Sequence, residues 1–172
     1  VLLAKGMTTE VAALLGMVLS AFMIVGSIVQ GSIVAKLGKM NKEYLIACGL
    51  AGVLLFAVYP APNDVLTIVF LCVGGFCAAG GMAVNFGRVS LLPLTGDFGP
   101  ESIGAAGGMV NTAMGLCGFV LPTLVASIFG ANYFAVFATI GAFFILIAIV
   151  GGLIIPELGE RGELAQKAEQ QQ

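Results

Sequence analysis

Three uncharged polar residues, Ser20, Asn111 and Thr112, lie well inside long apolar stretches of the sequence. Their hydroxyl and carboxamide groups can donate and accept hydrogen bonds, and polar groups are costly to keep in apolar surroundings. We therefore predict that these side chains contact a small solute or water along a path through the protein. A hydrogen bond between two helices, without any ligand, is the alternative interpretation.

A second set of candidate residues lies where the apolar stretches end. Arg88 is the only charged residue between Asp64 and Asp97. The role of its guanidinium therefore depends on the groups that it contacts. It could extend its guanidinium to the lipid headgroups, or it could join a charge network that acts as a gate. The predicted gate residues are Gly31, Lys36, Gly38, Lys39, Asn85, Arg88, Asp97, Glu101 and Glu157.

The residue types needed for most catalytic and metal sites are missing. The chain has no histidine, and all four of its cysteines lie within apolar stretches, where they behave as small apolar residues. No aspartate or glutamate lies in the middle of an apolar stretch to serve as a general acid or base. We therefore expect no metal, no cofactor, no enzymatic activity and no nucleic-acid partner.

The composition is that of an integral membrane protein. Hydrophobic residues make up 59% and charged residues 9% of the chain, and the mean hydropathy is +1.09. Soluble domains carry about 25% charged residues, which they need to cover a surface in water. The lipid bilayer is therefore the expected surrounding of most of the chain.

The apolar stretches predict an all-α polytopic fold with five transmembrane helices, since about 20 apolar residues cross a bilayer as a helix. Proline-rich and glycine-containing segments separate the stretches. Residues 1–156 are expected to form the helical bundle and residues 157–172 a polar cytoplasmic tail. The predicted spans are residues 8–35, 44–59, 65–92, 102–129 and 133–155.

Glycines recur at helical spacing in the third and fourth predicted spans. Small residues at this spacing let helices pack closely, and close approach of a substrate to the backbone is the alternative. The second and fifth spans have few polar atoms and are predicted to face lipid. The glycines assigned to helix packing are Gly74, Gly81, Gly104, Gly108 and Gly115.

The segment from Gly31 to Met40 resembles a loop motif of the major facilitator superfamily, in which a glycine precedes an acidic residue, a basic residue, a second glycine and further basic residues. Gly31, Lys36, Gly38 and Lys39 fit this pattern, while alanine stands at the acidic position. In that family the motif connects the second and third helices and, in a more degenerate form, the eighth and ninth.

Two further segments are similar to the same family. Pro100-Glu101 followed by Gly104 resembles the loop between the tenth and eleventh helices, and Pro156-Glu157 resembles the end of the twelfth. The resemblance implies a partial major-facilitator-type bundle formed by helices eight to twelve, with helices two to six as the alternative assignment. It also implies a secondary transporter, a symporter or an antiporter, that moves a small-molecule substrate by alternating access.

The basic residues predict the orientation, because lysine and arginine accumulate on the cytoplasmic side. In the five-span arrangement only Lys5 lies on the outer side; the inner side holds Lys36, Lys39, Lys42, Arg88, Arg161 and Lys167. We expect a multi-pass protein of a bacterial inner membrane with a cytoplasmic C-terminus. Its main partner would be the remainder of the transporter, about seven helices. A non-transporting membrane fragment or interaction module is the alternative.

Overall fold

The protein is described by a computed structural model that covers residues 2–95 and 99–157 of the chain. The described residues form helices connected by short turns, and they include no strand. The helices are η1 (Leu3–Lys5), α1 (Thr9–Leu37), α2 (Met40–Ala57), α3 (Asp64–Ser90), η2 (Leu92–Thr95), α4 (Ser102–Phe129), α5 (Tyr133–Ile149) and the π-helical turn η3 (Val150–Ile154).

Local sequence signals set several of the helix ends. The carboxamide oxygens of Asn63 and Asn132 accept hydrogen bonds from the backbone amides of Leu66 and Ala135, at 2.8 and 3.2 Å, and so cap α3 and α5. Helix α1 ends at Gly38, whose φ of 62° lies in the left-handed region that favours glycine. These ends follow from residues close by in the sequence.

Four helices within the described part of the chain are long and apolar enough to cross a membrane. They are Thr9–Leu37, Met40–Ala57, Asp64–Ser90 and Tyr133–Ile154. The described chain is thus all-helical and compatible with a multi-pass membrane protein. Helix α4 occupies the range of the remaining predicted span, and its crossing of the membrane stays a prediction.

Helix α2 begins at Met40, earlier than the predicted residue 44. The side-chain oxygens of Glu157 accept hydrogen bonds from the amides of Met40 and Asn41, at 2.8 and 3.0 Å. These amides have no partner within their own helix, so a carboxylate from the far end of the chain completes the first turn. The local sequence contains no sign of this contact.

Helix α2 packs between α3 and α5, and α1 packs along α3. The α2–α5 contact is close because two glycines face each other: a Cβ added to Gly52 would lie 2.7 Å from the backbone oxygen of Gly141. Ile46 and other large apolar side chains of α2 are nevertheless exposed, so the predicted contact of α2 with lipid stays a prediction. The small residues Ala47 and Ala51 of this helix are buried between two neighbours.

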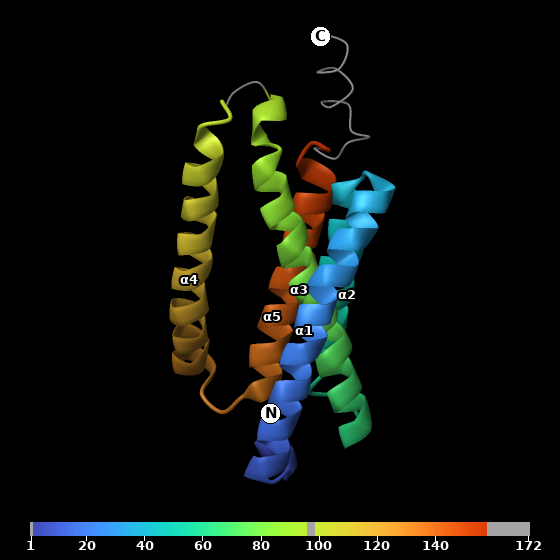
Figure 1. Cartoon of the computed structure of the whole chain (residues 1–172). Coiled ribbons are helices and arrows are strands. Elements are labelled where there is room, and N and C mark those ends of the chain that lie inside the picture. Colours follow the sequence, from blue (N-terminus) through green and yellow to red (C-terminus); the bar gives the residue numbers. More distant parts are fainter. Residues whose placement is uncertain (1, 96–98, 158–172) are drawn as a thin grey trace.

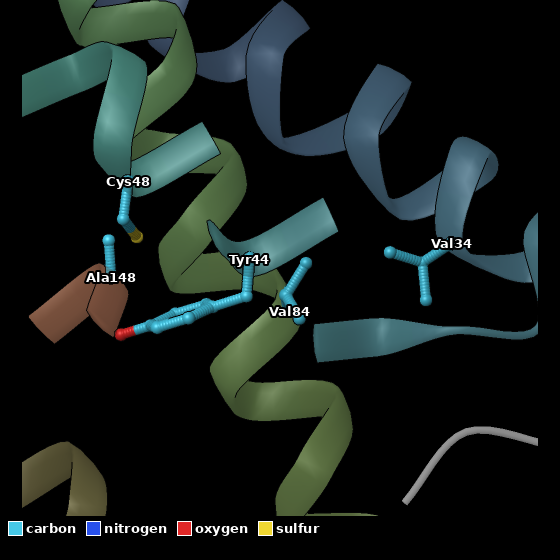
Figure 2. Packing of buried hydrophobic residues seen from close by; sticks show 5 residues of the cluster. All are labelled: Val34, Tyr44, Cys48, Val84 and Ala148. Carbon is cyan, nitrogen blue, oxygen red and sulfur yellow. The ribbon is translucent and has the colours of Figure 1, made fainter. Parts of the chain in front are cut away.

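Helix α4 stands to one side of the other long helices (Figure 1). Helix α1 is also largely exposed. Only 6% of its most apolar 18-residue segment is buried, against 50% of the corresponding segment of α3. The centre of packing is therefore the α3–α2–α5 layer. One apolar cluster joins α1, α2, α3 and α5 near the end of the bundle that carries the lysines (Figure 2); it contains Val34, Tyr44, Cys48, Val84 and Ala148.

Candidate functional site

Arg88 lies in the last turn of α3, and its side chain is only 6% exposed. One terminal nitrogen donates hydrogen bonds to Asn41 Oδ1 at 2.8 Å and to the backbone oxygen of Gly151 at 2.6 Å. The other donates to Asn85 Oδ1 at 3.3 Å. Its guanidinium therefore links α3 to the start of α2 and to the π-helical turn after α5.

The ring of Tyr44 forms one wall of this site. The Arg88 Cζ atom lies 4.4 Å from the ring centroid, which is within the range of a cation–π interaction. The Tyr44 hydroxyl accepts a hydrogen bond from Asn85 Nδ2 at 3.1 Å. The arginine is thus held by a ring face on one side and by oxygen atoms at its edge.

The π-helical turn brings its backbone to the arginine. A Cβ added to Gly151 would meet the ring of Tyr44 and would lie 3.1 Å from Arg88 Nη1, so only glycine fits at this position. A π-helical turn also changes the backbone hydrogen-bonding pattern, and such turns are frequent at functional sites. Here the backbone oxygen of Gly151 accepts from a side chain on another helix.

Glu157 is connected to Arg88 through Asn41. The carboxylate binds the first two backbone amides of α2, while Asn41 accepts from Arg88 and donates from Nδ2 to the backbone oxygen of Ile155 at 2.6 Å. A negative charge is favourable at a helix N-terminus, where backbone amides point outward. We call Asn41, Tyr44, Asn85, Arg88, Gly151 and Glu157 the Arg88 network.

The Arg88 network binds its cation mostly with uncharged groups. The hydrogen bonds described for Arg88 all end on neutral oxygen atoms, and its Nε atom is buried without a hydrogen-bond partner among the described residues. The guanidinium is buried and bonded to groups of the bundle, rather than extended away from it.

The other predicted gate residues lie around this end of the bundle. Lys36 lies in the last turn of α1, Lys39 is the N-cap residue of α2, and both side chains are exposed. Glu101 is exposed just before α4, and Gly31 is exposed on α1. Asp97 lies outside the described residues.

The predicted solute-path residues are not brought together. Ser20 is exposed on α1 and donates a hydrogen bond to the backbone oxygen of Gly16, at 3.0 Å, within its own helix. Asn111 and Thr112 are exposed on α4, away from the α3–α2–α5 layer. A solute path lined by these side chains stays a prediction.

The predicted packing glycines fall into two groups. Gly74 and Gly81 on α3 are buried against α2, where added Cβ atoms would meet Leu55 at 3.3 Å and the Cys48 sulfur, respectively. The three on α4 have no other atom within 4 Å of an added Cβ; they are Gly104, Gly108 and Gly115. Their predicted contacts would require a partner outside the described bundle.

A buried carboxamide lies where α1 crosses α3. Gln30 is 3% exposed, and its Nε2 atom donates to the backbone oxygen of Phe76 at 3.3 Å. Its Oε1 atom has no hydrogen-bond partner among the described residues, and a Cβ on Gly80 would overlap the carboxamide. Gly80 therefore creates the space that Gln30 occupies.

Sequence reasoning identified Arg88, Asn85 and Glu157 but missed Asn41, Tyr44 and Gly151. Asn41 is a polar residue in the lysine-rich connection, which was a usable signal. Gly151 gave none, because its role depends on the neighbouring tyrosine ring and on a π-helical turn.

Lys5 anchors the opposite end of the bundle. Its ammonium donates to the backbone oxygen of Ala61 at 2.9 Å and to Thr67 Oγ1 at 2.8 Å, which ties the start of the chain to the α2–α3 turn. Within the described residues, no group of three or more histidine, cysteine or acidic side chains could hold a metal ion. Comparisons with protein-family models, curated proteins and solved structures found no match.

Proposed function

We propose that this chain is part of a secondary active transporter of the major facilitator type, with five membrane crossings, and that the Arg88 network is its cytoplasmic gate. The observation that carries the proposal is one buried guanidinium bound to acceptors on α2, α3 and the turn after α5. The loop motif from Gly31 to Met40 supports the same assignment by resemblance.

A gate must have two discrete arrangements rather than a continuous range. Breaking the Arg88 network partway would leave buried oxygen atoms without donors, which is costly in a low-dielectric environment. The three elements that Arg88 connects would therefore move together or separate completely. This is the behaviour that alternating access requires from one bundle rocking against another.

The distribution of cations supports a cytoplasmic position for the network. Lys36, Lys39 and Arg88 lie at one end of the bundle, whereas Lys5 contacts the α2–α3 turn at the other. The basic end then faces the cytoplasm by the positive-inside rule. We assign binding of the coupling ion and of the substrate to residues in the remainder of the transporter.

The gate is tested with native Cys48, which is 1% exposed and lies beside Tyr44. The full-length transporter, with the other cysteines replaced by alanine, is labelled from the cytoplasmic side of inverted vesicles with a charged thiol reagent. We expect Arg88→Ala to accelerate labelling of Cys48, because the network no longer excludes water. Phe86→Ala, which removes an exposed side chain two residues before Arg88 on the same helix, is the matched control.

Equal labelling rates in the two variants would refute the gate. Transport itself is tested by solute uptake into proteoliposomes that contain the full-length protein. The proposal expects about seven further helices encoded upstream of this chain. A native product of five helices without uptake activity would instead favour the non-transporting membrane module.

A further inference from the structure

A groove of about 290 Å³ lies between the last turns of α1 and of α3. Its walls are apolar or glycine except at Ser90, whose hydroxyl is bonded to the backbone oxygen of Gly87 at 2.7 Å. Most of the surface that an occupant would contact is therefore apolar. The lining includes Gly31, Val34, Ala35, Met40, Ala83 and Leu91.

Three exposed lysines lie beside this groove in sequence and structure. Lys36 immediately follows the lining residue Ala35, Lys39 immediately precedes Met40, and Lys42 lies in the first turn of α2. No hydrogen bond or ion pair involving these ammonium groups is made within residues 2–95 and 99–157. Glu157, at the same end, is bound to the first amides of α2.

We propose that this groove binds an anionic phospholipid, with an acyl chain along the apolar walls and the headgroup phosphate on the lysines. Basic pockets between transmembrane helices on the cytoplasmic side are suited to anionic headgroups. The combination of an apolar channel and a cationic rim matches a molecule with both parts. A protein helix in the groove would have to cover or pair three ammonium groups, which is costly.

The inference depends on insertion of the bundle into a membrane and is independent of transport. Each lysine near a membrane surface contributes about 1 kcal/mol toward binding anionic lipid, so loss of all three predicts a roughly hundredfold weaker affinity. Loss of uptake activity would leave this proposal standing. Loss of the lipid site would leave the gate proposal standing.

Native mass spectrometry of the whole protein in detergent, titrated with phosphatidylglycerol or phosphatidylcholine, tests the site. We expect preferential retention of phosphatidylglycerol by the wild-type protein. The triple change of Lys36, Lys39 and Lys42 to glutamine should remove the preference. The corresponding triple change to arginine should preserve it, because the charge remains.

The groove is tested separately from the charge. Gly31→Leu fills the groove, and the added Cβ meets no atom within 4 Å, so the variant should fold. The Gly31→Leu variant should no longer retain phosphatidylglycerol preferentially, although all three lysines remain. Gly16→Leu is the matched control, because an added Cβ on this other α1 glycine also meets no atom within 4 Å. Circular dichroism checks that both variants keep the wild-type helix content.

Four outcomes would overturn the proposal. Equal retention of phosphatidylcholine and phosphatidylglycerol would remove the charge preference, and wild-type retention in Gly31→Leu would remove the groove. Displacement of phosphatidylglycerol by millimolar inorganic phosphate would indicate a site for a free anion. A cross-link in the full-length protein from Ala35→Cys to another helix, without bound lipid, would identify a protein segment as the occupant.

Discussion

Replacing Arg88 with leucine should destabilise the bundle by about 2 kcal/mol. Three hydrogen bonds would be lost, each contributing about 1 kcal/mol in a membrane protein, and a cation–π contact of about 1 kcal/mol would be lost with them. Against this, leucine removes a buried charge whose desolvation is unfavourable, which returns about 2 kcal/mol. The stranded acceptors are Asn41 Oδ1, Asn85 Oδ1 and the backbone oxygen of Gly151.

The variant Arg88→Lys separates charge from geometry. Lysine keeps the buried charge, but its single ammonium cannot reach acceptors on three elements as the planar guanidinium does. We therefore expect Arg88→Lys to be at least as unstable as Arg88→Leu. If charge alone stabilised the site, lysine would rescue it.

The free energy of unfolding is measured by circular dichroism during titration of the whole protein from dodecyl maltoside into sodium dodecyl sulfate. Lys36→Leu removes an exposed cation at the same end, and its effect should stay within about 0.5 kcal/mol. Wild-type stability of Arg88→Leu, or full rescue by lysine, would refute the hydrogen-bonding role assigned to the guanidinium.

Three further tests, one of which compares two glycine variants, address single contacts. Glu157→Ala should destabilise the first turn of α2 by about 1 kcal/mol, seen as faster hydrogen exchange of its amides; unchanged exchange would argue against the cap. Gly80→Ala should lower stability because the new methyl group overlaps Gln30, whereas Gly16→Ala on α1 should raise it by up to about 1 kcal/mol through helix propensity. The opposite order would contradict the α1–α3 packing. Tyr44→Phe should cost about 1 kcal/mol by removing the acceptor of one hydrogen bond, and a larger loss would indicate a second role for the hydroxyl.

Sequence patterns predicted the helices because hydrophobic length and capping residues are local properties. Asn63 and Asn132 occupy the N-cap positions that their side chains favour. The start of α2 was misplaced because Glu157, more than a hundred residues away, completes its first turn. Counting polar residues also gave no sign of the close packing of α2. Its alanines and Gly52 give it close contacts on two sides, and small residues carry this information better than hydropathy does.

The candidate site was predicted only in part for the same reason. Arg88 and Asn85 are conspicuous because polar side chains are rare in apolar stretches. Gly151 is not, since one glycine in an apolar stretch resembles any other. Its function arises from a carbonyl oxygen exposed to the guanidinium and from the absence of a Cβ against Tyr44.

The two kinds of glycine face indicate where further contacts of this bundle should form. On α3, Gly81 is buried against α2, so its face is already used. On α4, Gly108, Asn111 and Gly115 lie on one face at helical spacing, and the structure leaves that face open. Lipid gains little from a glycine surface and cannot satisfy a carboxamide, whereas a second helix or a water-filled path can do so. We therefore expect the glycine face of α4, rather than the apolar face of α5, to meet the further helices of the proposed transporter.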